Sequence, residues 1–292
     1  MEGDGKAAPR FQTRAKVLWD DGALYIGAEL WGTELWGHIT QRDAVIFRDN
    51  DFEIFIDPDS DTHVYVEFEM NILNTVWDLL LTKPYRDGGR PITSFDIKGL
   101  ESAVMVEGEI NNPRSDNRRW TVEVRMPFES LLECRGQGAL VPRPGDYWRL
   151  NFSRVQWPVD ISEGGYKKRL NPATGAPLPE DNWVWAPTGL VNIHYPELWG
   201  FLFFCREDEV YAIPPDEYLV WKLRRLYYKE HAIFDETGAF SPDLPAAGPE
   251  GEIDGLVIDA SAYGFTLSCP ALDGETRLLL RRDGLVERVK RV

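Results

Sequence analysis

Short segments in which apolar and polar side chains alternate recur along the first two-thirds of this 292-residue chain. Alternation with a period of two is typical of β-strands, because successive side chains point to opposite faces of a sheet. Turns rich in Pro, Gly and Asp separate the segments. The pattern predicts an all-β sandwich of antiparallel strands in jelly-roll or immunoglobulin-like layers. The predicted strands cover residues 14–19, 23–30, 52–57, 64–72, 120–126 and 148–154.

The pattern changes in the last third of the chain. Asp216 follows two prolines and is a candidate helix cap, and apolar residues then recur at helical spacing up to Gly238. Two Asp-Gly pairs, at 273–274 and 283–284, are typical of tight hairpins. We therefore predict a sandwich in residues 1–205 and a small C-terminal α+β extension, a helix plus an antiparallel meander, in residues 206–292.

Composition excludes several classes of protein. A formal net charge of −16 would repel phosphate backbones, so we expect no nucleic-acid partner. The three cysteines are widely spaced and form no CxxC motif, which indicates neither a zinc site nor a disulfide framework. No apolar stretch is long enough to span a bilayer, and residues 1–6 lack the apolar core of a signal peptide.

Long loops are predicted near residues 84–95 and 156–182, and loops of this length usually carry function. The polar faces of the predicted strands carry Glu67, Glu69 and Glu123. Solvent exposure explains these glutamates at least as well as a role facing a ligand.

Several motifs, taken in their order along the chain, resemble one known family. They lie at residues 16–21, 42–43, 49–58, 67–71, 74–78, 120–124, 145–154, 182–185 and 194–200. Together they resemble the bacterial family 9-like carbohydrate-binding proteins, which are related to the family 9 carbohydrate-binding modules of xylanases. The matching residues run from Thr13 to Phe204, so the extension lies outside the resemblance.

The resemblance implies non-catalytic binding of an oligosaccharide or polysaccharide, in polysaccharide recognition or breakdown. It implies a β-sandwich that holds sugar at one end between aromatic rings, often with structural calcium. In the resembled proteins an earlier segment adds one more strand, so we expect a strand to be missing beside residues 14–19. A start of this kind would also explain the absent signal peptide, and the location would then be extracellular or periplasmic.

The resemblance places one stacking Trp just before residues 52–57, where this chain has Phe47 or a neighbour. The second Trp position falls near Ile193 or His194, so the pair of Trp rings is not preserved as such. Trp77, Trp183 and Trp185 are the candidate substitutes, since sugar contact needs flat rings with hydrogen-bonding groups nearby. Trp77 is expected in the core, whereas core packing and stacking both suit Trp183. The predicted ligand-binding residues are Phe47, Arg48, Asn50, Asn182, Trp183, Trp185 and His194.

Asp57, Asp59 and Asp61 alternate as carboxylates do at the start of an EF-hand loop. Thr62 stands where that loop needs Gly, and Phe68 where it needs Glu. The sequence therefore favours a polar turn, with these three aspartates as weak metal candidates.

Two other functions stay open. A glycoside hydrolase, or an accessory subunit of a glycan-degrading system, would need carboxylates about 5–10 Å apart across a cleft, and no catalytic residue is predicted. Some related sandwiches bind haem through Met, and this chain offers Met70, Met105 and Met126. Met70 and Met126 fall on apolar strand faces, so we expect both in the core.

Overall fold

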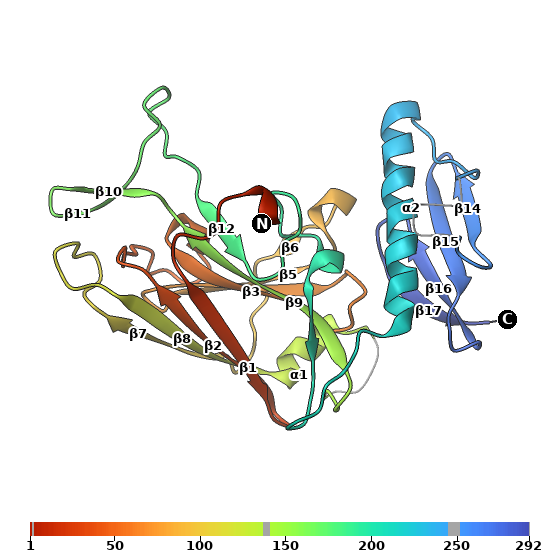
Figure 1. The fold of residues 1–292 in the computed structure, drawn as a ribbon, viewed down its shortest axis with the longest axis horizontal. Helices are drawn as coiled ribbons and strands as arrows, with labels where there is room; N and C mark the ends of the chain where they lie inside the picture. Colours follow the sequence, from red (N-terminus) through yellow and green to blue (C-terminus); the bar gives the residue numbers. More distant parts are fainter. Residues whose placement is uncertain (2, 137–140, 245–251, 292) are drawn as a thin grey trace.

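Two β-sheets pack face to face, and a helix-and-sheet unit lies at one end of them (Figure 1). The computed structural model describes residues 1, 3–136, 141–244 and 252–291. The predicted fold class, a β-sandwich with a small α+β extension, is confirmed. Among the described helices, none is both long and apolar enough to cross a membrane.

The smaller sheet has the strand order β1-β2-β8-β7. Its strands are β1 (Thr13–Trp19), β2 (Ala23–Trp31), β7 (Glu101–Glu107) and β8 (Arg119–Pro127). Within the described chain only β2 pairs with β1, so β1 is an edge strand. A further strand beside it stays a prediction.

The larger sheet has the order β12-β9-β3-β4-β5-β6, and β13 also pairs with β9. Its strands are β3 (Asp51–Asp57), β4 (Tyr65–Asn71), β5 (Val76–Leu81), β6 (Pro91–Ile92), β9 (Tyr147–Gln156), β12 (Asp181–Val184) and β13 (Gly200–Phe203). Each of the six strands predicted from alternation is present to within one or two residues.

The main core lies between the two sheets. Phe52, Ile54 and Ile56 of β3 are fully buried there, as the alternation predicts. Each such side chain contributes about 1.5–3 kcal/mol by leaving water. Met70 and Met126 are also fully buried in this core, as expected.

The outer face of the larger sheet is covered as well. Ile193 and Trp199 pack there against Phe55 and Tyr65, and Met1 packs against the same cluster. Glu67 and Glu69 point to this face and are only 7% and 1% exposed, so solvent exposure, one of the two explanations left open for them, is wrong. Alternation assigns a residue to a face, but it does not reveal what covers that face. Glu123 is exposed, as predicted.

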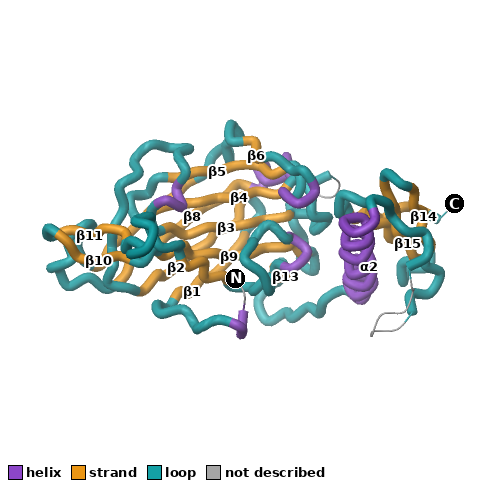
Figure 2. Tube along the Cα trace, turned by 90° about the horizontal axis from the view of Figure 1, so that it is seen from above, coloured by secondary structure: helices purple, strands orange, loops and turns teal. Residues whose placement is uncertain are grey.

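Short elements connect the strands. They are η1 (Gly3–Gly5), η2 (Ile46–Arg48), η3 (Tyr85–Asp87), α1 (Phe128–Leu131), η4 (Leu132–Cys134) and η5 (Pro196–Leu198). Within the predicted loop 156–182, β10 (Val159–Ser162) and β11 (Gly165–Lys168) form a two-stranded hairpin. The hairpin projects from the end of the sandwich opposite the C-terminal unit (Figures 1 and 2).

The C-terminal unit is α2 (Pro215–Thr237) beside a four-stranded sheet of order β14-β15-β16-β17. Its strands are β14 (Val257–Ser261), β15 (Gly264–Pro270), β16 (Thr276–Arg281) and β17 (Val286–Lys290). The two predicted Asp-Gly turns join β15 to β16 and β16 to β17, and β14 was not predicted. Gly238 ends the helix in the left-handed conformation, as expected. Asp216 is not the cap, because Pro214 holds that position and the Asp216 carboxylate accepts a hydrogen bond from the Leu272 N–H at 2.8 Å.

Candidate functional site

A pocket of about 310 Å³ lies where the β10–β11 hairpin folds against the loop before β3. We call it the hairpin pocket. Three stretches of chain meet there: the segment after β2, the turn η2 and the hairpin itself. Its lining residues are Trp36, His38, Arg48, Asp49, Val159, Tyr166, Lys167 and Lys168.

Side-chain contacts tie the hairpin to the sandwich. The Tyr166 hydroxyl donates a hydrogen bond to the carbonyl of Thr33 at 2.7 Å. Lys168 Nζ lies 3.1 Å from the centroid of the Trp157 ring, a cation–π contact. Trp157 in turn donates its ring N–H to the carbonyl of Phe47 at 2.8 Å. The hairpin, Trp157 and the Phe47 loop therefore form one assembly.

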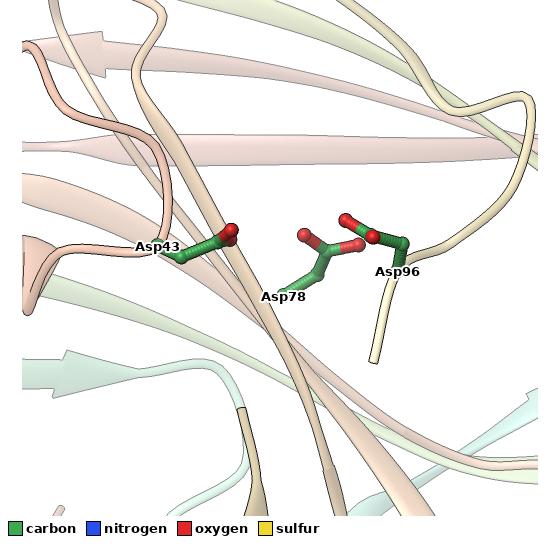
Figure 3. A group of neighbouring side chains, drawn as sticks. All are labelled: Asp43, Asp78 and Asp96. Carbon is green, nitrogen blue, oxygen red and sulfur yellow. The ribbon is translucent and has the colours of Figure 1, made fainter. Parts of the chain in front are cut away.

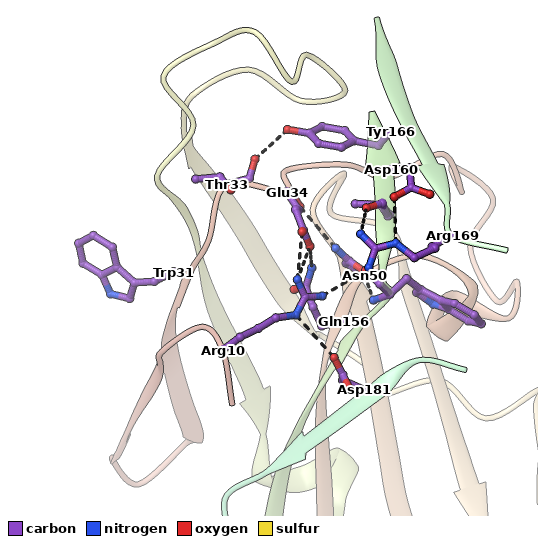
Figure 4. A network of polar contacts seen from close by, with 12 residues as sticks. Arg10, Trp31, Thr33, Glu34, Asn50, Gln156, Asp160, Tyr166, Arg169 and Asp181 are labelled. Carbon is purple, nitrogen blue, oxygen red and sulfur yellow. Dashed lines mark hydrogen bonds and ion pairs between the residues drawn. The ribbon is translucent and has the colours of Figure 1, made fainter. Parts of the chain in front are cut away.

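A polar network supports this assembly from the side of the N-terminal segment (Figure 4). Glu34 accepts hydrogen bonds from Arg10 at 3.0 Å and from Gln156 at 2.9 Å. Asn50 is 4% exposed, and its side-chain oxygen accepts the Trp157 backbone N–H at 2.8 Å. Asn50, a predicted ligand-binding residue, thus positions Trp157 and has little surface to offer a ligand.

The hairpin pocket contains polar groups whose hydrogen-bonding capacity the described protein does not use. Neither Arg48 nor Lys168 makes a side-chain hydrogen bond or ion pair with the described residues, and Trp36 Nε1 is buried without a partner among them. One oxygen of Asp49 accepts from the backbone N–H groups of His38 and Ile39 at 2.7 and 2.8 Å. Partial burial lowers the pKa of Lys168. Aromatic rings beside unused donors are the combination that sugar hydroxyls and ring faces require.

A second pocket, of about 400 Å³, opens between β1 and the β12 and β13 edge of the larger sheet. We call it the edge slot. Its aromatic lining residues are Phe11, Phe52, Phe152, Trp183, Trp185, Phe201 and Phe203. The Trp185 ring is 55% exposed and covers Gly200, where an added Cβ would come within 2.3 Å of that ring.

The one charged group in the lining of the edge slot is Arg154. Each of its nitrogens already donates to the protein, with acceptors that include the carbonyl of Trp31 at 2.9 Å and the side chain of Gln156 at 2.8 Å. Burial lowers the pKa of Arg154 to about 9. The edge slot is therefore apolar, with its charged group fully engaged.

The predicted ligand-binding residues lie in different parts of the structure. Trp183 and Trp185 line the edge slot, whereas Arg48 lines the hairpin pocket and Phe47, 38% exposed, is bonded to Trp157. The predicted stacking rings are thus not gathered in one pocket, because Phe47 lines neither the edge slot nor the hairpin pocket.

Asn182 and His194 line neither pocket. The backbone carbonyl of Asn182 accepts the Met1 amino group at 2.9 Å. The Nδ1 atom of His194 lies 3.0 Å from the Tyr65 hydroxyl on the outer face of the larger sheet. Trp77 packs on the same face, partly buried, beside the cluster of Phe55 and Tyr65.

Sequence reasoning missed Trp36, Trp157, Tyr166 and Lys168. Trp157 lies three residues after the predicted strand 148–154, at the start of the long loop 156–182. That loop was expected to carry function, which was the available signal. The sequence around Trp36 gave no such signal, because only the fold brings Trp36 to the hairpin.

The weak metal candidates Asp57, Asp59 and Asp61 each offer one carboxylate oxygen within 4.8 Å of the others. Backbone N–H groups already bind these carboxylates: Thr62 donates to Asp57 at 2.8 Å, His63 to Asp61 at 2.7 Å and Gly136 to Asp59 at 2.8 Å. Asp59 Oδ1 is buried without a hydrogen-bond partner among the described residues, and a metal at this turn stays a prediction.

Residues 1–140 match the model of a family described as carbohydrate family 9 binding domain-like. No curated protein matches the chain. A protein from Bacteroides uniformis, whose own assignment to carbohydrate binding is provisional, is 14% identical over 66% of this chain and 78% of that chain, with a TM-score of 0.46. A family 9 carbohydrate-binding module from Caldicellulosiruptor kristjanssonii in complex with glucose is 16% identical over 70% of this chain and 83% of that chain, with a TM-score of 0.41.

Proposed function

Because residues 1–140 match the model of the carbohydrate family 9 binding domain-like family, we propose that the protein binds carbohydrate without cleaving it. We place the sugar in the hairpin pocket. The observation that supports this place is a set of polar groups that make no hydrogen bond with the described residues, namely Arg48, Lys168 and Trp36 Nε1. Lys168 also joins the pocket to the adjoining ring of Trp157. A sugar presents hydroxyls and apolar ring faces together, so it needs both kinds of partner.

The edge slot offers apolar contact for a sugar ring, but its one charged group is not free to bind the hydroxyls. Its rings are suited to apolar contact, but Arg154 has no nitrogen without a protein acceptor. A sugar in the edge slot would leave its hydroxyls buried without partners, which costs free energy. For this reason Trp183 and Trp185, although predicted as stacking residues, are the weaker place for a ligand.

The test compares two tryptophans. Cello- and xylo-oligosaccharides are titrated into the wild type and into the variants Trp157→Ala and Trp185→Ala, and affinity is measured by calorimetry. We expect Trp157→Ala to weaken binding at least about fivefold, since a lost ring contact is worth on the order of 1 kcal/mol. Trp185→Ala should bind like the wild type. The reverse result would move the site to the edge slot, and no binding of any glycan would refute the function.

A glycoside hydrolase is the main alternative. Glu53 and Glu67 lie on the outer face with raised pKa values, which a hydrolase acid needs, but they are only 6% and 7% exposed. A sugar could not enter between them without displacing the chain that covers this face. Incubation with oligosaccharides should therefore release no new reducing ends.

A further inference from the structure

Two basic side chains line the hairpin pocket without an acidic partner. Arg48 and Lys168, which we call the pocket cations, make no ion pair within the described part of the chain. The third basic residue of the lining, Lys167, differs from them, because it pairs with Glu163 at 2.5 Å on the exposed side of the hairpin. The chain has 48 acidic residues against 32 basic ones, so the pocket cations do not lack partners through a shortage of carboxylates.

Other arginines of this chain are neutralised by the protein itself. The carboxylates of Asp78 and Asp96 point toward each other (Figure 3), and the Arg42 guanidinium lies 2.5 Å from the first and 2.8 Å from the second. Arg149 pairs with Glu217 at 2.8 Å. Pairs of this kind use the positive charge inside the protein, whereas the pocket cations keep theirs available to a ligand.

The carboxylates nearest to the pocket cations do not neutralise them. Asp49 is 3% exposed, and its Oδ2 atom accepts two backbone N–H groups and the Asn71 amide, the last at 3.1 Å. Burial is the main cause that lowers the pKa of Lys168; Asp49 and Glu180 act against it, and Arg48 adds to it. Because the net shift is downward, the protein does not supply the counter-charge that a partly buried ammonium requires.

The lining side chains of the pocket offer more free donors than free acceptors. Arg48 and Lys168 only donate, and Trp36 Nε1 is a further donor that is buried without a partner among the described residues. Asp49 is engaged by the surrounding chain, and the Tyr166 hydroxyl already donates one hydrogen bond and accepts another. A neutral sugar hydroxyl has to donate as well as accept, whereas an ionised carboxylate or sulfate ester only accepts.

We propose that the hairpin pocket binds a sugar that carries an anionic group, either a uronic acid carboxylate or a sulfate ester. The planar guanidinium of Arg48 fits two oxygens of such a group, and the Lys168 ammonium adds a second positive charge. Lys168 Nζ lies 3.1 Å from the centroid of the Trp157 ring, so the anion is held beside a flat ring that suits the apolar face of the sugar. This assignment rests on the function proposed above and names the class of sugar for the same pocket.

The net charge of the whole chain makes this preference a local property. At −16 the protein as a whole repels anionic glycans, so an anionic sugar gains affinity only where basic side chains stand together without partners. Tighter binding of an anionic sugar would therefore report on a particular site and not on general attraction.

The experiment compares three forms of one trisaccharide by calorimetry with the whole chain. The forms are cellotriose, cellotriose with its C6 hydroxyls oxidised to carboxylates, and cellotriose 6-sulfate. We expect one or both anionic forms to bind at least about tenfold more tightly than cellotriose, because hydrogen bonds between charged groups are the stronger ones. The two anionic forms also distinguish a uronic acid from a sulfate ester.

Variants then locate the preference. Arg48→Gln and Lys168→Gln should each lower the ratio of anionic to neutral affinity several-fold. Arg48 is exposed, so its variant serves if Lys168→Gln folds poorly. Lys229→Gln removes the same charge from an exposed position on α2, in the C-terminal unit, and should keep the wild-type ratio.

Each contrary result has a separate meaning. Equal affinity for the three forms, or tightest binding of cellotriose, would overturn this assignment and leave carbohydrate binding in place. A preference that survives in both Arg48→Gln and Lys168→Gln would place the anion elsewhere and overturn it as well. Binding of none of the three forms would also overturn it, and the proposed function itself would fail only if the xylo-oligosaccharides were not bound either.

Discussion

His194 is an imidazole held among aromatic rings. Its ring centroid lies 5.8 Å from that of Phe55 and 4.6 Å from that of Tyr85, and the Tyr65 hydroxyl is bonded to Nδ1. Burial lowers its pKa to about 4, from an ordinary value of 6.5. The side chain is therefore neutral at pH 7 and acts in packing, although the sequence had placed it among the ligand-binding residues.

A pH dependence follows from this shift. The unfolded chain binds a proton at His194 near pH 6.5 and the folded chain only near pH 4, so stability contributed by the neutral ring is lost as pH falls through that window. In urea unfolding, the wild type should lose about 2.5 kcal/mol more between pH 7 and pH 4.5 than His194→Gln, which lacks the titrating group. Equal losses in the two proteins would show that His194 does not titrate in this way.

The sequence predicted the positions of some residues correctly and of others wrongly, because alternation reports which face of a strand a residue lies on and nothing more. Alternation placed Phe52 and Met70 in the core correctly, because the opposing sheet always covers that face. It misjudged Glu69, because the alternation of β4 does not show that the Phe47 loop lies against this side chain, which accepts the Phe47 backbone N–H at 3.0 Å. Trp157 and Trp36 both come near Lys168 only through the fold, so no local pattern could relate them.

Among the elements, the β10–β11 hairpin most directly shapes the hairpin pocket. Each of its strands has only four residues, and they pair only with each other among the described strands. Strands this short give too little alternation to be recognised, which is why the sequence predicted a loop there. Longer strands such as β3 and β9 were predicted because they alternate over seven and ten residues. A two-stranded hairpin is marginally stable alone, so its position depends on contacts with the sandwich.

Tyr166 is the contact that can be removed most cleanly. Tyr166→Phe deletes the hydroxyl that donates to Thr33 and accepts from Asn117, but keeps the ring in the pocket lining. We expect unfolding free energy to fall by about 1 kcal/mol and glycan affinity to fall several-fold, as the hairpin loosens. Tyr211→Phe is the control, since among the described residues its hydroxyl bonds only the exposed Glu209, near the start of the extension. Wild-type affinity in Tyr166→Phe would show that the hairpin needs no such anchor.

On the scale of the whole molecule, we propose that residues 1–205 and 206–292 are two structural units that fold and unfold in a single cooperative transition. Strands β14 to β17 pair among themselves, so no sheet continues from one unit to the other in the described chain. The joint is instead polar. Arg149 of β9 is bonded to Glu217 of α2 at 2.8 Å, and Tyr227 of α2 donates to Asp87 at 2.6 Å. The C-terminal unit thereby contacts the sandwich at the end opposite the hairpin pocket.

The Arg149–Glu217 pair tests whether this joint couples the two units. Both side chains are at most 10% exposed, and Glu217 also accepts from Tyr147 at 2.7 Å. Removing one partner of a buried pair leaves the other charge unpaired, which costs about 3–5 kcal/mol. In Glu217→Ala we therefore expect the single melting transition of the wild type to move down and to split in two, with proteolytic cleavage appearing near residues 205–214. Glu209→Ala removes an exposed carboxylate in the same linker and should melt like the wild type. A Glu217→Ala protein with one unshifted transition would mean that the units stay coupled without this ion pair.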